Sequence, residues 1–193
     1  WVGHPMIDLT KKLPLKKDAR AMLNLRSDQS ILLLMPASRP QELRYVLPTF
    51  MRAAKKLQQK YPSLVVYIPS CRQSFDEIFK KAFRKYQIKG LVISQKDSAK
   101  LKPYIYSLTK IALCKSGTVN MELALNGIPQ IVGYKVSRVT AFIARKILNF
   151  KVRFISPVNL LVNKLIIPEF VQKDFNEKKI FYKSCRILEG KSE

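Results

Sequence analysis

The sequence has few of the residues that build disulfide frameworks, metal centres or histidine-based catalytic triads. Its three cysteines, Cys71, Cys114 and Cys185, are far apart and odd in number. This spacing argues against a disulfide framework and a Cys-x-x-Cys metal site, and it is typical of a reducing compartment. His4 is the single histidine, so a multi-histidine metal site is excluded and a Ser-His-Asp triad has little to draw on.

Long apolar runs are also absent. The longest cover only a few residues, as over 31–35, whereas a membrane-spanning helix needs roughly 18. No secretory signal pattern opens the chain. The sequence begins with Trp1 rather than methionine, so we expect a fragment or a processed form of a longer protein.

Acidic residues are scarce, since 13 Asp and Glu stand against 36 Lys and Arg, and the net charge is +23. Such an excess predicts an anionic partner, which is a nucleic acid, an anionic membrane surface or an anionic substrate. A lysine-rich surface in a genome with biased codon usage explains the charge equally well. The basic residues are spread along the whole chain, which disfavours a dedicated nucleic-acid-binding arm.

Apolar runs alternate with amphipathic segments, and 47% of the 193 residues are apolar, which is ample for one globular core. Buried strands are expected at 31–35, 64–69, 91–94, 111–114 and 130–134. Helices are expected at 18–24, 40–60, 74–86, 97–108, 118–126, 137–149 and 177–188. The alternation predicts an α/β fold with a Rossmann-like parallel sheet and helices on both faces.

Three helix starts carry capping signals. Ser38 with Gln41 and Ser74 with Glu77 have capping-box spacing, and Asp97 precedes the third helix. The absence of G-x-G-x-x-G and of G-x-x-x-x-G-K-[ST] removes support for a dinucleotide fingerprint and for a P-loop.

The motif Lys-Ser-Gly-Thr-Val-Asn-Met-Glu at 115–122 lies between a buried strand and a helix that ends at Gly127. Free N–H groups and the helix dipole at such a junction suit a phosphate. Thr118 and Glu122 are four residues apart, so they share one helix face, where the carboxylate could bind sugar hydroxyls. The same residues also fit a helix that is simply well capped.

Polar residues follow three of the expected strands. Arg39, Ser70 and Ser116 each lie just past a strand end. Ligands of parallel sheets bind beyond the carboxyl ends of the strands, where the strand order reverses, so one crevice could gather all three. Arg39 could clamp a phosphate there, or it could be an ordinary solvated arginine.

The segment 138–154 combines an apolar face with five basic residues. Two interpretations stay open for it. It could be an interfacial helix that meets anionic lipid headgroups, or an ordinary helix of the layer with a basic outer face.

Five motifs in order resemble the C-terminal half of the lipid-A-disaccharide synthases, most closely the cyanobacterial and plastid versions. The resemblance runs from Val2 to about Leu188. The motifs are Val-Gly-His-Pro at 2–5, Leu-Met-Pro-Ala-Ser-Arg at 34–39, Lys-Ser-Gly-Thr-Val-Asn-Met-Glu at 115–122, Ser-Pro-Val-Asn-Leu-Leu at 156–161 and Ile-Pro-Glu-Phe-Val-Gln at 167–172.

The resemblance implies a GT-B-type glycosyltransferase with two Rossmann-like domains, of which this chain is similar to the C-terminal, nucleotide-sugar-binding one. We therefore expect an inter-domain segment at 1–30 and the nucleotide-sugar-binding domain at 31–193. The acceptor domain and the general base are expected in an N-terminal half outside this chain. By itself the chain is then expected to be inactive.

Members of this family transfer 2,3-diacylglucosamine from UDP-2,3-diacylglucosamine to 2,3-diacylglucosamine 1-phosphate, with inversion and without a metal or cofactor. The implied partners are these two lipid substrates, the N-terminal domain of the same protein and an anionic membrane surface. The resemblance leaves a homodimer open and gives nucleic acid no role. It implies a cytoplasmic location, peripheral to the inner membrane, or the plastid stroma for a plastid-encoded protein.

The resemblance also implies a UDP-sugar donor site, with no catalytic base and no metal ligand in this chain. Ser116, Gly117 and Thr118 match the turn at the UDP phosphates, and Glu122 matches a glutamate that holds the ribose in related transferases. The complete set of implied donor-site residues is Ser38, Arg39, Ser116, Gly117, Thr118, Glu122, Asn159, Glu169 and Gln172.

The sequence departs from the family pattern at two places. Ala37 replaces the usual glycine of Gly-Ser-Arg, which adds a methyl group where the backbone approaches the ligand. Pro157 lies one position earlier than the proline of Ser-Leu-Pro-Asn. The alternative to a transferase domain is a basic module that binds nucleic acid or a membrane surface and has no transferase activity.

Overall fold

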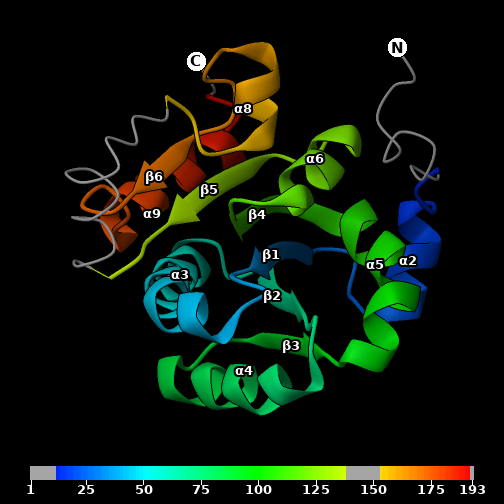
Figure 1. Ribbon diagram of the computed structural model, residues 1–193. Coiled ribbons are helices and arrows are strands. Elements are labelled where there is room, and N and C mark those ends of the chain that lie inside the picture. Colours follow the sequence, from blue (N-terminus) through cyan, green and yellow to red (C-terminus); the bar gives the residue numbers. More distant parts are fainter. Residues whose placement is uncertain (1–11, 138–152, 192–193) are drawn as a thin grey trace.

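The computed structural model describes residues 12–137 and 153–191 (Figure 1). Its centre is one six-stranded sheet in the order β3-β2-β1-β4-β5-β6, and every neighbouring pair of strands is parallel. The predicted Rossmann-like parallel sheet is therefore confirmed. The strands are β1 (Ser30–Met35), β2 (Leu64–Pro69), β3 (Gly90–Ile93), β4 (Thr109–Lys115), β5 (Gln130–Tyr134) and β6 (Glu169–Val171).

The two central strands, β1 and β4, read as continuous apolar runs because helices cover both faces of the sheet. Ile31 to Leu34 and Ile111 to Cys114 have no exposed surface. Successive side chains point to opposite faces, so Leu32 and Leu34 pack on one side, and Ile31 and Leu33 on the other. The middle of the sheet is thus a rigid base for the loops at its ends.

Helices form a layer on each face of the sheet, as predicted (Figure 1). The longer helices α3, α4 and α9 turn an apolar stripe towards the strands and a largely polar surface outward. One layer contains α3 (Pro40–Lys60), α4 (Gln73–Tyr86) and α9 (Glu177–Leu188). The other contains α2 (Lys16–Leu23), α5 (Gln95–Leu108), α6 (Thr118–Leu125) and α8 (Pro157–Val162).

All three capping predictions are wrong about how the helices begin. The N-cap of α3 is Arg39 and that of α4 is Arg72, and neither side chain makes a capping hydrogen bond. Helix α5 is capped by Ser94, whose hydroxyl accepts from the N–H of Asp97 at 3.3 Å. Helices α3 and α4 thus begin without a side-chain cap, whereas α5 follows the usual preference for a serine at this position.

One helix of the structure was not predicted from the sequence, and one predicted helix lies where the structure describes too little to test it. Helix α8 was not predicted, although Ser156 caps it and Pro157 occupies its first turn, where proline is favoured. The predicted helix at 137–149 and most of the basic segment 138–154 lie outside the described residues. None of the helices within 12–137 and 153–191 is both long and apolar enough to span a membrane.

Candidate functional site

The strand order reverses between β1 and β4, so the chain leaves these neighbouring strands towards opposite helix layers. The loops after the two strands face each other across a cavity of about 240 Å³. Ser38 enters from the first loop, and Ser116, Gly117 and Thr118 enter from the second. Four of the predicted site residues therefore share one cavity at the place where ligands of this architecture bind.

Gly117 is the N-cap of α6, and its backbone is extended, with φ 162° and ψ −172°. A Cβ atom at this position would meet no heavy atom within 4 Å. The chain thus leaves free space beside the first N–H groups of α6, where an anion would be stabilised by those groups and by the helix dipole. Ala37 also lines the cavity, and it is not among the residues with positive φ, so its methyl group brings no backbone strain.

A buried network of hydrogen bonds supports the turn at Gly117, and the sequence analysis did not predict it. Asn120 is fully buried, and its Oδ1 accepts from the N–H of Gly117 at 2.9 Å. Its Nδ2 donates to Gln130 Oε1 at 3.1 Å, and Gln130 Nε2 donates to the carbonyl of Asn120 at 2.9 Å. The sequence signals that could have predicted this network are an asparagine in the first turn of the helix and a glutamine at the start of the next strand, because buried side-chain amides need hydrogen-bond partners.

The loop that leads into α8 is tied to the same turn. The Ser116 hydroxyl donates to the carbonyl oxygen of Ile155. The Glu169 carboxylate accepts from the N–H groups of Ile155 at 2.7 Å and Ser156 at 2.8 Å. It also accepts from Asn159 Nδ2 at 2.7 Å. Both carboxylate oxygens are therefore engaged within the chain, beneath the candidate site and not in its open space.

Asn159 uses its whole amide inside the fold as well. Its Oδ1 accepts from the N–H groups of Ile166 and Ile167 at 3.0 and 2.9 Å, and its Nδ2 also donates to the Ile167 carbonyl at 2.7 Å. Gln172 has the left-handed φ of 53°, and its N–H donates to the Tyr134 carbonyl at 3.0 Å. Asn159, Glu169 and Gln172 thus lie outside the cavity that Ser38 and Gly117 line.

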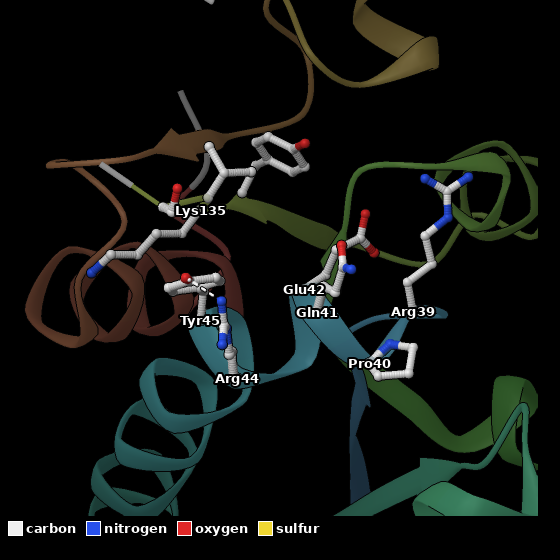
Figure 2. Close-up of a pocket in the computed structure, with 10 residues that line it drawn as sticks. Arg39, Pro40, Gln41, Glu42, Arg44, Tyr45 and Lys135 are labelled. Atoms are coloured by element: carbon white, nitrogen blue, oxygen red, sulfur yellow. Dashed lines mark hydrogen bonds between the residues drawn. The ribbon is translucent and has the colours of Figure 1, made fainter. Parts of the chain in front are cut away.

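Arg39 lines a second cavity, of about 560 Å³, between the start of α3 and the end of β5. Figure 2 shows Arg39 at one end of this cavity and Lys135 at the other, with Arg44 lying against Tyr45 between them. Arg44 Nη2 donates to the Tyr45 hydroxyl at 2.8 Å. Among the described residues the Arg39 guanidinium makes no hydrogen bond or ion pair, so its donors are available to a ligand.

An ion pair separates the two cavities. Lys115 Nζ lies 2.7 Å from Glu42 Oε1, and both side chains are largely buried, at 18% and 14% exposed. Lys115 lines the smaller cavity, and Glu42 lines the larger one. The pair neutralises Lys115, whereas Arg39, which lines the larger cavity, has no acidic partner among the described residues.

Glu122 and Ser70 do not lie where the sequence analysis expected them. Glu122 points towards α5, where its Oε1 lies 2.6 Å from Lys102 Nζ, instead of sharing a ligand-facing side with Thr118. Burial, and then the nearby Glu122 carboxylate, raise the pKa of Tyr106. The Ser70 hydroxyl is buried and donates to the Arg72 carbonyl at 2.8 Å, so the prediction that Ser70 joins the crevice is wrong.

The cysteines are free thiols, as the sequence predicted. Cys114 is fully buried at the end of β4, and this burial raises the pKa of its thiol to about 12. Burial also raises the pKa of Cys71, which lines the smaller cavity. No three His, Cys, Asp or Glu side chains gather as a metal site within 12–137 and 153–191.

The strand order and the cavity at its reversal define a Rossmann-like domain. The E. coli ADP-heptose lps heptosyltransferase II superposes with a TM-score of 0.65 at 9% identity, over 91% of this chain and 51% of that one. A glycosyl transferase family 9 protein from Veillonella parvula superposes with a TM-score of 0.61 at 10% identity, over 91% and 50%. The predicted fold is thus confirmed.

The sequence identifies the family within this fold. The family model described as lipid-A-disaccharide synthetase matches residues 1–193, and the chain belongs to this family. The lipid-A-disaccharide synthase of Prochlorococcus marinus is 47% identical over 98% of this chain and 48% of that protein. That of Gloeothece citriformis is 36% identical over 97% and 48%. The chain spans about half the length of the curated relatives it matches.

Proposed function

We propose that this chain provides the UDP-sugar donor site of a glycosyltransferase of lipid A biosynthesis. In the reaction, the acceptor hydroxyl of 2,3-diacylglucosamine 1-phosphate attacks the anomeric carbon of UDP-2,3-diacylglucosamine. The bond from that carbon to the UDP oxygen breaks with inversion, and the acceptor proton passes to a general base. The products are the lipid A disaccharide 1-phosphate and UDP.

One observation carries this proposal. The open space at Gly117 lies beside the N-terminus of α6, at the reversal of the strand order. A diphosphate placed there would accept hydrogen bonds from the first free N–H groups of α6 and from the hydroxyls of Ser38 and Thr118. Arg39 would balance the negative charge that develops on the departing UDP, and no metal ion is needed for that.

The other predicted residues receive different roles. Glu122 would bind the ribose hydroxyls, and this requires exchange of its present partner, Lys102. Asn159 and Glu169 would be positioning residues, because their hydrogen bonds hold the loop whose Ile155 carbonyl contacts Ser116. Gln172, at the end of β6, would contact the sugar unit of the donor.

The remaining functional assignments follow from family membership. We propose that 31–193 forms the nucleotide-sugar-binding domain, that 1–30 connects it to an acceptor domain, and that the acceptor domain supplies the general base. Both substrates carry acyl chains, so the protein would work at an anionic membrane surface, consistent with its net charge of +23.

Binding of UDP tests the proposal directly. UDP at about 100 times its dissociation constant stabilises the folded state by about 2.7 kcal/mol. In a chain of this size we expect a rise in melting temperature of about 5–10 °C. Arg39→Ala and Glu122→Ala should abolish the rise. If UDP leaves the melting temperature of the unaltered chain unchanged, the proposal is wrong.

Two glycine variants separate ligand binding from stability. Gly117→Ala should fold with the stability of the parent, because its Cβ meets no protein atom, yet lose the UDP-induced shift because the methyl group occupies the phosphate space. Gly127 has φ +64°, so Gly127→Ala should lower the melting temperature through backbone strain and keep the UDP shift. The opposite pattern would exclude a phosphate site at Gly117.

A further inference from the structure

Helix α8 and the loop after it carry five exposed aliphatic side chains within seven residues. Leu161 is 68% exposed and Leu165 is 60% exposed. We name this surface the aliphatic platform, and its members are Leu160, Leu161, Val162, Leu165 and Ile166. It stands at the edge of the molecule, at the top of Figure 1. Exposed aliphatic side chains gathered in one short segment indicate an interaction site.

The platform is built into the fold. Asn159 holds the far end of the loop through the N–H groups of Ile166 and Ile167, at 3.0 and 2.9 Å. The Lys164 N–H donates to the Asn159 carbonyl at 3.2 Å, and Asn163 closes the helix in a left-handed conformation. The aliphatic side chains therefore point outward from a backbone that hydrogen bonds keep in place.

The charged residues next to the platform in the sequence have one sign. Between Arg153 and Pro168 the sequence contains no Asp or Glu, and the two basic residues, Arg153 and Lys164, are both exposed. The next acid, Glu169, turns its carboxylate inward to the N–H groups of Ile155 and Ser156. This surface is complementary to an anionic, apolar partner.

We propose that the aliphatic platform is the part of this domain that enters an anionic lipid interface. Leu161 and Leu165 would pass into the boundary between headgroups and acyl chains, while Lys164 and Arg153 would bind lipid phosphates. Aliphatic side chains with a basic rim suit this environment better than a protein partner, whose interfaces favour aromatic residues and exclude lysine. The inference deepens the proposed function, on which it rests.

The platform also connects the membrane to the donor site. Hydrogen bonds of Glu169 and Asn159 hold both the platform and the loop at Ile155. The carbonyl oxygen of Ile155 in turn accepts a hydrogen bond from the Ser116 hydroxyl. A lipid surface that contacts the platform would therefore lie at a fixed distance from Gly117. Such an arrangement suits a donor that carries its acyl chains in the membrane.

Vesicle flotation with the complete chain tests the inference. We expect binding to phosphatidylcholine vesicles that contain phosphatidylglycerol and weak binding to phosphatidylcholine alone. Leu161→Ser with Leu165→Ser should weaken the binding at least about tenfold, because two aliphatic side chains no longer leave water. The matched control, Leu15→Ser with Leu91→Ser, removes two leucines that are 72% and 49% exposed elsewhere and should bind as the parent does.

Charge is tested by a second pair of variants. Lys164→Gln should reduce binding to the anionic vesicles, whereas Lys81→Gln, an exposed lysine on α4, should reduce it less. Unchanged binding after the Leu161 and Leu165 replacements, or equal losses in both leucine pairs, would overturn the inference. It would also be overturned if the parent self-associates without vesicles and the platform variant is monomeric, since the surface then joins two copies.

The UDP-induced melting shift, measured on the same variants, keeps the two proposals apart. A normal shift with no vesicle binding refutes the platform alone. Vesicle binding that depends on the platform in a chain without any UDP shift refutes the donor site and leaves the platform standing.

Discussion

Two buried side-chain amides fix the backbone around the candidate site. Asn120 holds the turn at Gly117 from within α6, and Asn159 holds the loop behind Ser116. Each amide donates and accepts at the same time, so a replacement leaves several buried partners without hydrogen bonds. Asn120 depends in turn on Gln130, which opens β5.

Asn120→Ala should therefore destabilise the fold. The change leaves Gln130 Oε1 and the N–H of Gly117 without their partner and opens a small cavity, so we expect a loss of about 2–4 kcal/mol. Urea denaturation measures it. The control, Asn126→Ala, removes one bond to the Glu122 carbonyl at the end of α6 and should cost less than about 1 kcal/mol. Equal losses of unfolding free energy in the two variants would show that the buried network stabilises the fold no more than a single hydrogen bond at the helix end.

At the scale of elements, α9 closes the helix layer by packing along α3. Glu189, which follows the last residue of α9, makes polar contacts with the end of α3. Its Oε1 accepts hydrogen bonds from Lys60 Nζ and from the Tyr61 hydroxyl, each at 2.8 Å. The hydrogen bonds from Lys60 and then Tyr61 lower the pKa of Glu189 to about 2, from an ordinary value of 4.5. The same carboxylate raises the pKa of Lys60.

This contact predicts a pH dependence of stability. A carboxyl group with a lowered pKa in the folded state stabilises that state above its unfolded pKa and loses the effect as the group is protonated. Glu189→Gln should therefore unfold at lower urea than the parent near neutral pH, and the difference should vanish as the pH falls from about 4.5 to about 2. Glu77→Gln, whose partner Lys80 lies in the same helix, should show a smaller difference. A constant difference across this range would contradict the assignment.

Most elements could be predicted from the sequence, and their ends and caps could not. The five longer strands are continuous apolar runs, and α3, α4 and α9 show apolar spacing of helical period, so these segments follow from local pattern. Helix α8 has only six residues and β6 only three, too few for a period to show. The caps at Arg39, Arg72 and Ser94 depend on how far each strand end lies from its helix.

For the whole molecule, the charge of +23 raises the question of nucleic acid. In the described part of the chain, basic residues occur on α2, α3, α4, α5 and α9, in both helix layers. Phe50, Phe75, Phe79 and Phe175 are buried, so these rings cannot stack on bases. The structure thus favours general attraction of anions over a nucleic-acid site.

Retention on immobilised single-stranded DNA should accordingly be weak. We expect binding at low salt through counterion release and its loss near an ionic strength of roughly 0.15 M, where exposed charges are screened. Fluorescence anisotropy with a labelled oligonucleotide over a salt series measures this. Binding that persists at physiological salt and competes with UDP would support the alternative function over the proposed one.

The sequence by itself determined the α/β class, the positions of most strands and helices, and the family. Periodicity and ordered motifs are local properties of the chain, so they can be read without knowing which segments meet. A phosphate turn at Ser116, Gly117 and Thr118 could be proposed from the sequence because a strand, a small-residue turn and a helix follow one another directly.

Only the tertiary structure decided which distant residues lie together. It paired Glu122 with Lys102, Glu42 with Lys115 and Asn120 with Gln130. It also enclosed Asn159 and Glu169 beneath the turn and turned the side chains of Leu161 and Leu165 outward. These contacts depend on strand order and helix packing, which bring together residues that are far apart in the sequence. The local sequence around each residue does not indicate which distant residue it will contact.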